Sequence, residues 1–498
     1  MNALATGLNS GMHADLVTVW PEILLAVGLC VVLVVDMFLK DSYRDVTYLL
    51  TILLLAFLAW SLLATGTGSG GGGGGWGGET TLAFGGSYIS DPLSRVLKLF
   101  AVAAVATVFL YSRPYLRARG LHLGEFYVLG LFGLLGILVL ASSYSLLVSY
   151  LGLEILSLSL YSMVAFNRES PVAAEAAMKY FVLGAIASGT LLYGMSLVYG
   201  VTGSLNIGDL QATIGTAQAS SLSLWVGLAF MVAGVAFKFG AVPFHMWVPD
   251  VYQGAPTAVT LYVGTAPKLG ALALAIRILV EGMPAVGDLW QVMLAALAVL
   301  SLVLGNVAAI AQTNVKRMLA YSTIAHVGFI LLGFVAGTPE GIQAALFYTL
   351  VYVIMATGSF GFLVLLSSRG EEVETLEDLR GLWQRSPWFA LMMVLLMVSM
   401  IGVPPLAGFY AKWWVLSALL QTGHVGLAIV ALVASVIGAY YYLRVIRMML
   451  FDDGGQAHAG GVPLDVRLVL SVNVLLLLLI GLLPDRLLEL CARAAALI

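Results

Sequence analysis

The stretch from Phe237 to Thr260, FKFGAVPFHMWVPDVYQGAPTAVT, decides the fold. An apolar run that carries Lys238 enters this stretch and breaks at Pro243, and the apolar run that follows it carries Lys268. An ionised lysine in hydrocarbon is costly, and a proline inside a spanning helix frees backbone groups that need other partners. The surrounding chain must therefore supply polar partners for the two lysines and for the backbone groups that the proline-rich turn between them leaves free.

The composition is that of a polytopic membrane protein. Of the 498 residues, 61% are hydrophobic and only 10% are charged, and the mean hydropathy is +1.00. A soluble domain carries about 25% charged residues, and no basic cluster indicates nucleic-acid binding. The two cysteines, Cys30 and Cys491, support neither a disulfide framework nor a metal site. We expect no metal or cofactor in this chain and a lipid bilayer around it.

The apolar runs predict an all-α membrane protein. Because a span needs about 20 mostly apolar residues, the sequence predicts about fourteen transmembrane helices. The predicted spans are 17–38, 46–64, 92–112, 124–142, 144–166, 174–200, 222–246, 257–280, 288–310, 317–336, 341–367, 387–420, 424–451 and 466–484. The seventh and the twelfth are long and interrupted by proline.

A faint internal repeat relates these two interrupted helices. Ala233–Lys238 and Ala407–Lys412 share the pattern Ala-Gly-x-x-x-Lys. The two patterns are five helices apart, an odd number, so helices 4–8 and 9–13 would form two five-helix repeats of opposite orientation, with broken helices at corresponding positions. The expected organisation is a three-helix N-terminal segment with a Gly-rich loop (1–115), a first antiporter-like repeat (116–282), a second one (283–452) and a C-terminal helix (453–498).

The loops indicate the orientation of the chain. With the N-terminus outside, most Lys and Arg residues fall in cytoplasmic loops or helix ends, Lys40, Arg117 and Arg385 among them, so we expect both termini on the periplasmic side. The glycine run 66–78 then lies in an outer loop and lacks the Gly-Lys-Ser/Thr ending of a phosphate loop, which favours a flexible connection. The acidic segment 368–387 is interpreted as a solvated amphipathic segment on the cytoplasmic side.

Four ionisable residues lie near the middle of predicted spans: Glu154, Lys238, Lys268 and Lys412. Each central charge costs about 2.5–3.5 kcal/mol on insertion scales, and one glutamate cannot neutralise three lysines. A lysine that exchanges an apolar environment for one beside a carboxylate can bind and release a proton near neutral pH. These residues predict a proton pathway; the alternative is that they form buried ion pairs that fix helix packing.

Two histidines are further candidates. His245 follows the break in the seventh helix and His326 lies within the tenth, and each can relay protons at physiological pH. For His326 a hydrogen-bonded core histidine fits equally well. Asp250 is expected to be solvated or to cap the eighth helix. Hydroxyl residues such as Ser157 and Thr323 could line water paths or hold helices together.

A family resemblance emerges from three segments. Phe244–Thr257 (FHMWVPDVYQGAPT) closely resembles the signature of the antiporter-like membrane subunits of bacterial respiratory complex I, in the form typical of the N-type branch. Asn314–His326 (NVKRMLAYSTIAH) and Pro404–Phe409 (PPLAGF) are similar to further segments of that family. The resemblance runs from the first predicted helix to the last.

The resemblance implies fourteen helices with two inverted repeats, and a pathway in which Glu154 pairs with Lys238. It also implies a central role for Lys268, and it implies that Lys412 is the lysine form of the helix-twelve position. The assembled complex would oxidise NADH, reduce a quinone and pump protons across the bacterial inner membrane. Its other membrane subunits would be the partners of this chain, and NAD, FMN, iron–sulfur clusters and quinone would bind mainly elsewhere.

Two alternatives remain open at this point. One is a subunit of a multi-subunit sodium/proton antiporter, which would share the fold and the lysines. The other is a membrane scaffold that conducts no ion. No nucleophile–base set, metal-ligand spacing or nucleotide loop appears in the chain, so we expect no redox centre in it under any of these interpretations.

Overall fold

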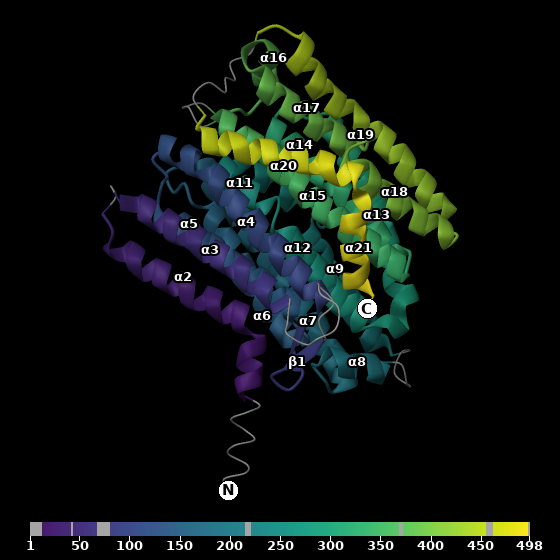
Figure 1. Cartoon of the computed structure of the whole chain (residues 1–498). Helices are drawn as coiled ribbons and strands as arrows, with labels where there is room; N and C mark the ends of the chain where they lie inside the picture. Colours follow the sequence, from purple (N-terminus) through teal and green to yellow (C-terminus); the bar gives the residue numbers. More distant parts are fainter. Residues whose placement is uncertain are drawn as a thin grey trace.

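The computed structural model describes residues 12–40, 43–66, 80–214, 221–367, 372–454 and 462–496. Within these ranges the chain is an α-helical bundle with a single two-stranded hairpin (Figure 1). Thirteen stretches of the described chain are long and apolar enough to cross a membrane. The predicted all-α membrane fold is therefore confirmed. The predicted outer loop 66–78 lies outside the described residues beyond its first glycine.

The first half of the chain contains long apolar helices joined by shorter elements. They and the shorter elements among them are α2 (Trp20–Phe38), α3 (Arg44–Gly66), β1 (Thr81–Ala83), β2 (Tyr88–Ser90), α4 (Pro92–Ala118), α5 (Gly124–Ser142), α6 (Leu146–Val164), α7 (Pro171–Thr202), α8 (Ile207–Thr213), α9 (Leu222–Phe239), α10 (Trp247–Gly254), α11 (Thr257–Val263) and α12 (Pro267–Ala275). The two strands pair antiparallel, and α12 continues into a π-helical turn, Ile276–Glu281.

The second half begins after this turn. Its helices are α13 (Gly287–Ile310), α14 (Val315–Val335), α15 (Pro339–Leu366), α16 (Leu382–Arg385), α17 (Pro387–Ile401), α18 (Ala407–Gln421), α19 (Val425–Phe451), α20 (Leu464–Leu482) and α21 (Pro484–Ala495). The predicted twelfth span corresponds to the pair α17 and α18, which completes the set of fourteen predicted spans.

Both helices that were predicted to be interrupted stop inside the bundle. The seventh ends at Phe239, earlier than the predicted boundary of 246, and resumes as α10; the twelfth is split into α17 and α18. The residues that follow the two first halves, Gly240 and Gly402, have φ values of 79° and 88°. Glycine adopts this left-handed conformation at no steric cost, so each helix can end there. The eighth span is also divided, into α11 and α12.

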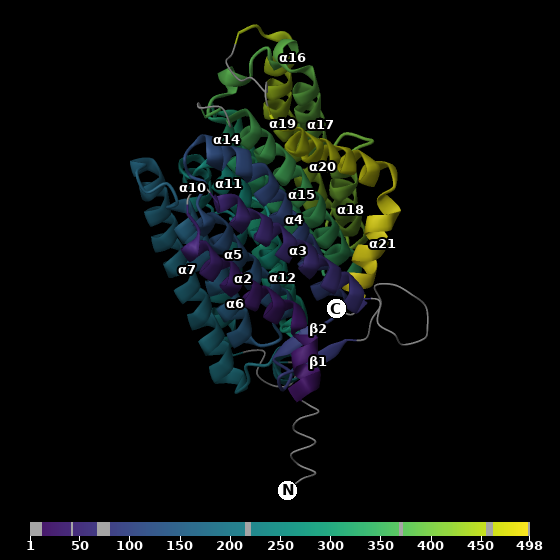
Figure 2. The same ribbon diagram turned by 60° about the vertical axis from the view of Figure 1, so that its left-hand side comes forward.

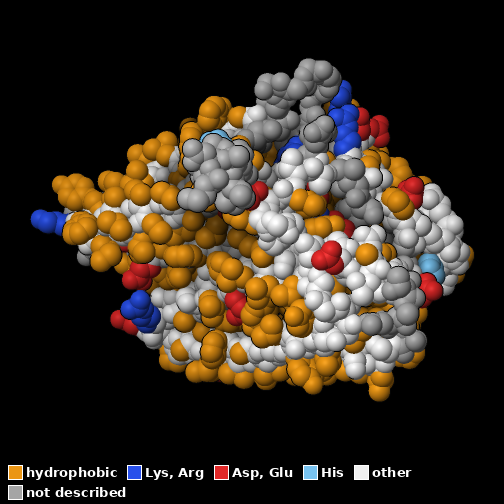
Figure 3. All heavy atoms as spheres, turned by 90° about the horizontal axis from the view of Figure 1, so that it is seen from below, with side chains coloured by type: hydrophobic (Ala, Val, Ile, Leu, Met, Phe, Trp, Pro, Cys, Tyr) orange, Lys and Arg blue, Asp and Glu red, His pale blue; other side chains and the backbone are white. Residues whose placement is uncertain are grey.

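The centre of the bundle is formed by α11, α12, α14 and α15. The most apolar window of α15 is 100% buried, whereas that of α2 is 33% buried. Helix α15 packs against α4, α14, α18, α20 and α21, and Figures 1 and 2 show the remaining helices arranged around it. The space-filling view in Figure 3 shows hydrophobic side chains over much of the periphery and charged ones only singly or in small groups, as expected of a surface that meets lipid and other membrane chains.

The described residues nearest the two termini lie toward the same end of the bundle, together with β1 and α8 (Figures 1 and 2). The turn between α10 and α11 and the short helix α16 lie toward the opposite end. A chain that crosses a membrane an even number of times has both termini on one side, so this arrangement agrees with the predicted number of spans.

A buried arginine joins three elements at the end that carries β1. Arg277, in the π-helical turn, is 0% exposed. Its guanidinium donates to Asp91 Oδ1 at 2.8 Å, to Glu281 Oε1 at 2.6 Å and to the carbonyl of Ala141 at the end of α5. Burial on its own would raise the pKa of Asp91, the N-cap of α4, but Arg277 outweighs this and lowers it. This ion pair is therefore a fixed structural contact.

We predict that Arg277→Leu destabilises the protein by about 3–5 kcal/mol, because it leaves two buried carboxylates without their cation. The measurement is the thermal unfolding midpoint of the purified protein in detergent, with the exposed Arg486→Leu as the matched control. An unfolding midpoint equal to that of the wild type would contradict the structural role of Arg277.

Candidate functional site

The first polar contact of the site joins α9 to α6. Lys238 lies in the last turn of α9, and its Nζ donates to Ser157 Oγ on α6 at 2.8 Å. Glu154 precedes Ser157 by three residues, so both side chains lie on one side of α6. Among the described residues, Glu154 and Lys238 form no ion pair within 4.0 Å, and Glu154 Oε1 is buried without a hydrogen-bond partner. The Glu–Lys pair implied by the family resemblance is here a lysine–serine contact beside the glutamate.

The lysine of the eighth span donates a hydrogen bond to the C-terminal end of α9. Lys268 is 1% exposed, and its Nζ donates to the carbonyl oxygen of Phe239 at 2.7 Å. Trp247 at the start of α10 donates its indole N–H to the carbonyl of Phe237 at 3.0 Å. Carbonyls at a helix C-terminus lack partners within the helix and carry partial negative charge. The ammonium group of Lys268 therefore lies at the residue next to Lys238.

The lysine of the twelfth span makes the same kind of contact. Lys412 on α18 donates to the carbonyl of Ile401, the last residue of α17, at 2.8 Å and to Ser435 Oγ on α19 at 2.8 Å. Lys238 precedes the break in its helix, whereas Lys412 follows the break in its own. The two Ala-Gly-x-x-x-Lys patterns thus do not occupy equivalent positions, and the counterpart of Lys412 by contact is Lys268.

All three lysines have uncharged hydrogen-bond partners. Their ammonium nitrogens lie 5.6 Å, 5.8 Å and 5.3 Å from the ring centroids of Phe237, Trp247 and Phe329, respectively. None of the three has a carboxylate within 4.0 Å in the part of the chain that the structure describes. Carbonyl, hydroxyl and aromatic partners stabilise a cation without holding it as firmly as a carboxylate does.

His326 on α14 lies between hydroxyl groups. Its Nδ1 is 2.8 Å from the hydroxyl of Tyr348 and its Nε2 is 3.1 Å from that of Tyr442, which also contacts Ser322. A cavity of about 10 Å³, with His326 and Lys412 on its wall, has room for about one water molecule. An imidazole with a partner at each nitrogen can accept a proton on one side and release one on the other.

Tyr352 links this region to the eighth span. Its hydroxyl donates to Thr323 Oγ1 at 2.9 Å and lies 3.5 Å from the carbonyl oxygen of Gly264, at the division between α11 and α12. Its ring centroid is 5.3 Å from that of His326. Tyr352 therefore connects the division in the eighth span with Thr323 and His326 on α14.

The structure thus places five of the six predicted site residues in two groups of contacts, one around the end of α9 and one around the cavity beside His326. These are Glu154, Lys238, Lys268, His326 and Lys412. His245, in the connection between α9 and α10, is half-buried, and within the described chain its Nδ1 has no hydrogen-bond partner. The conducting roles of all six stay predictions. No group of three His, Cys, Asp or Glu side chains that could hold a metal occurs among the described residues.

The tyrosines around His326 were not predicted from the sequence. Tyr348 and Tyr442, 22 and 116 positions from His326, place their hydroxyls at its ring nitrogens, and the packing of α14, α15 and α19 makes these contacts. Tyr352 places its hydroxyl at Thr323. One signal was present: Tyr348 and Tyr352 are four residues apart and therefore on one side of α15. Spacing of this kind in an apolar helix indicates a polar side of the helix but does not predict which residues on other helices it contacts.

Two acidic residues are placed differently from expectation. Asp250 does not cap α11, whose N-cap is Pro256; it accepts hydrogen bonds from Lys179 on α7 at 2.9 Å and from Arg317 on α14 at 2.7 Å. Burial on its own would raise the pKa of Asp250, but these two cations outweigh it and hold the pKa below the usual aspartate range. Asp250 fixes α10 between two neighbouring helices.

Glu372 is not solvated with the rest of the acidic segment. Tyr115 on α4 donates its hydroxyl to Glu372 Oε1 at 2.6 Å, and Thr257 Oγ1 donates to the same oxygen at 2.7 Å. The solvated interpretation of 368–387 is therefore wrong at this position. Glu372 therefore accepts hydrogen bonds from Tyr115, near the end of α4, and from Thr257, at the start of α11, which would otherwise bond water.

Interrupted helices and buried lysines with polar partners inside a membrane-spanning bundle are features of an ion-transporting membrane protein. Residues 143–438 match the family described as NADH:quinone oxidoreductase/Mrp antiporter, transmembrane, and the chain belongs to this family. It is 54% identical over 481 residues to NADH-quinone oxidoreductase subunit N of Thioalkalivibrio sulfidiphilus, covering 96% of this chain and 98% of that relative. The corresponding protein of Alkalilimnicola ehrlichii is 52% identical, with 95% of each chain covered.

Solved structures show the same fold. A chain of respiratory complex I from Thermus thermophilus is similar with a TM-score of 0.79 at 34% identity, over 95% of this chain and 99% of that one. A chain of the Mrp complex from Dietzia sp. is similar with a TM-score of 0.82 at 22% identity, over 97% of both chains. At that identity the second likeness supports the fold alone.

We predict that Asp250→Asn loosens α10. Because the folded pKa of Asp250 lies below its usual 3.8, its stabilisation is complete above that pH and is lost only as pH falls through the folded value. Between pH 6 and 8 the substitution should therefore remove about 1 kcal/mol at every pH. Hydrogen exchange of the α10 amides should be about fivefold faster. The exposed Asp288→Asn is the control. Unchanged hydrogen exchange in α10 would contradict the role of Asp250 in fixing this helix between α7 and α14.

Proposed function

We propose that this chain is a proton-translocating membrane subunit of a bacterial NADH–quinone oxidoreductase, the respiratory complex I. The observation that carries the proposal is the path of lysines, hydroxyls and one histidine between α6 and α19. Relatives named NADH-quinone oxidoreductase subunit N, at 54% and 52% identity over nearly the whole chain, support it. The chain takes part in the enzyme as its translocase and contributes no redox centre.

Each segment of the path has a defined task. Glu154 and Ser157 exchange a proton with Lys238, which lies next to the residue that Lys268 contacts. Tyr352 and Thr323 continue the path to His326. The cavity beside His326 holds the water that carries the proton to Lys412, from which it leaves the membrane. His245 is a further candidate relay beside the first break.

Charge repulsion couples successive steps. Two like charges about 10 Å apart at an effective dielectric constant of 20 repel by about 1.7 kcal/mol, which is more than one pKa unit. Protonation of one lysine therefore lowers the proton affinity of its neighbours, and a change of charge in an adjacent subunit acts in the same way. Because none of the three lysines is hydrogen-bonded to a carboxylate, their charge states can respond to this coupling.

The rest of the assembly supplies the redox chemistry. NAD, FMN, iron–sulfur clusters and quinone bind mainly in other subunits, and the other membrane subunits are the partners of this chain. Both termini lie on the periplasmic side, as the distribution of Lys and Arg favours. Residues 116–282 and 283–452 form the two antiporter-like repeats, between the N-terminal segment 1–115 and the C-terminal helix 453–498.

A sodium/proton antiporter subunit is the alternative with the same fold. The likeness to the Mrp complex supports that fold at 22% identity, whereas the relatives of subunit N are identical at more than half of the aligned positions. The two functions differ in the other subunits with which the chain associates. Co-purification with NADH-oxidising subunits supports complex I, and sodium-dependent proton exchange without them would support the antiporter.

We predict that Lys238→Ala impairs proton pumping in the assembled complex. Removal of a positioned proton-transfer group slows the transfer by about 10²–10⁴-fold, so fewer protons should be pumped per NADH oxidised. The measurement is NADH-driven proton uptake in proteoliposomes alongside quinone reduction, with the exposed Lys40→Ala as the control.

Two results would count against this assignment. Pumping at the wild-type ratio in Lys238→Ala would remove Lys238 from the path. A Lys238→Ala complex that only fails to assemble, together with Glu154→Gln and Lys412→Ala complexes that pump normally, would favour the scaffold.

A further inference from the structure

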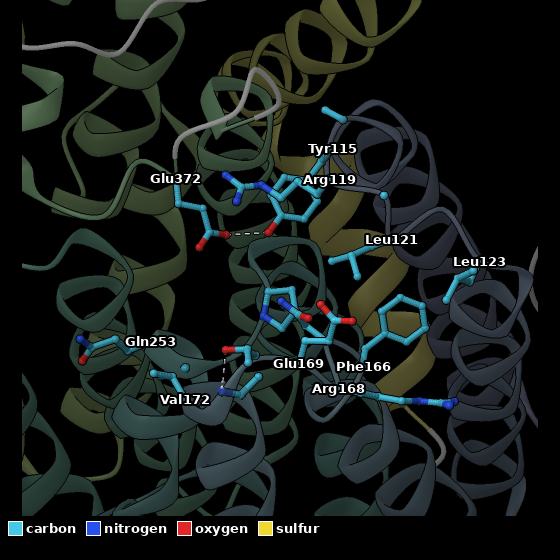
Figure 4. Close-up of a pocket in the computed structure, with 18 of the residues that line it drawn as sticks. Tyr115, Arg119, Leu121, Leu123, Phe166, Arg168, Glu169, Val172, Gln253 and Glu372 are labelled. Atoms are coloured by element: carbon cyan, nitrogen blue, oxygen red, sulfur yellow. Dashed lines mark hydrogen bonds between the residues drawn. The ribbon is translucent and has the colours of Figure 1, made fainter.

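A large cavity opens at the end of the bundle that carries the turn between α10 and α11. Its volume is about 840 Å³, and it is lined by the end of α4, residues 166–173, the turn 253–256, Lys316 and Glu372. Figure 4 shows Glu372 and Arg119 close together on one side of the cavity and Glu169 facing them from another. Such a space holds many water molecules, and its walls carry charges of both signs.

The floor of this cavity contains a buried lysine. Lys316, in the first turn of α14, is 1% exposed, and its Nζ donates to the carbonyl oxygen of Ala255 at 3.2 Å. The nearest carboxylate oxygen, Oε2 of Glu372, is 3.9 Å away, too far for a direct hydrogen bond. An ammonium group has three donors, so within the described chain Lys316 keeps donors for water from the cavity.

Glu372 is held as a fixed anion beside this lysine. Its other oxygen accepts from Tyr115 and Thr257, and Figure 4 shows the first of these hydrogen bonds. Burial on its own would raise the pKa of Glu372, but Lys316 and the two hydroxyls outweigh it and lower it. Glu372 therefore stays ionised and positions Lys316. The other charged groups that face Lys316 are Glu374 in the same segment and Arg119 on α4.

A polar stripe leads from this lysine to the centre of the molecule. Lys316, Thr323 and His326 are seven and three residues apart and lie on one side of α14. At 1.5 Å per residue the stripe is about 15 Å long. Tyr352 contacts both Thr323 and the ring of His326. Lys316 on the cavity wall and His326 at the centre therefore lie on the same side of a single helix.

We propose that this cavity is the cytoplasmic entrance for protons, and that Lys316 passes each proton from cavity water to the stripe on α14. The neutral amine takes a proton from cavity water, which exchanges with cytoplasmic buffer. The ammonium then gives a proton to the chain of hydroxyls and water that leads to His326. No other bond forms or breaks. The inference rests on the proposed function and places uptake on α14, where Glu372 is the positioning residue.

The decisive experiment uses Lys316→Arg and Lys316→Gln in the complete complex in proteoliposomes. Arginine keeps the positive charge beside Glu372, and therefore the assembly, but its guanidinium does not release a proton. We expect proton transfer through this chain to slow about 100-fold or more in both variants, so that fewer protons are pumped per NADH. Quinone reduction in the presence of an uncoupler should stay at the wild-type level, as in the control Lys40→Gln.

Normal pumping by Lys316→Arg would overturn the proposal, because a purely structural ion pair is rescued by arginine. If Lys316→Gln does not assemble, the arginine variant alone decides. A second measurement is the pH profile of pumping in Glu372→Gln, which keeps an oxygen for Tyr115 and Thr257. Without the anion, the alkaline half-maximal point should move to lower pH; an unchanged profile, like that of the exposed control Glu377→Gln, would also overturn the proposal.

The same preparations separate this inference from the proposed function. If Lys268→Ala loses pumping and Lys316→Arg does not, the entrance lies elsewhere and the proposed function stands. If Lys238→Ala and Lys268→Ala both pump at the wild-type ratio, the proposed function fails and the entrance fails with it.

Discussion

The structure depends on how two helices end inside the bundle. A helix that stops in a medium without water leaves carbonyl groups that must find a donor within the protein. At α9 and α17 that donor is a lysine: Lys268 reaches the carbonyl of Phe239, and Lys412 that of Ile401. The partial negative charge of each helix end favours the ammonium group, and the ammonium group allows the helix to end there. The interrupted helix and the buried ammonium group therefore stabilise each other.

The charged residues fall into two groups by the nature of their partners. At both ends of the bundle Arg277 and Asp250 have partners of opposite charge on neighbouring elements. Such pairs hold helices in register and keep their charge states constant. Along the path, the lysines contact carbonyls, hydroxyls and aromatic rings instead. A cation with neutral partners can lose its proton without leaving an unpaired carboxylate behind, so the same bundle combines rigid ends with a titratable interior.

Lys316 occupies the boundary between these groups. It has a carboxylate nearby, as the residues at the ends do, but the separation of 3.9 Å leaves room for water. It also begins the stripe that leads along α14 to His326, whose partners are hydroxyls. The segment that supplies Glu372 joins α4 and α11 through hydroxyl donors, so the shape of the cavity depends on elements far apart in the chain.

The sequence by itself determined the membrane class, the number of spans, the two interruptions and the isolated charges within the spans, because apolar length, proline and isolated charges have a local cost in hydrocarbon. It did not determine which carbonyl each lysine contacts, that Lys238 contacts Ser157 and forms no ion pair with Glu154, or that Glu372 accepts a hydrogen bond from Tyr115. Those contacts join residues as many as 257 positions apart. Only the packing of whole helices brings them within hydrogen-bond distance, and no local pattern records it.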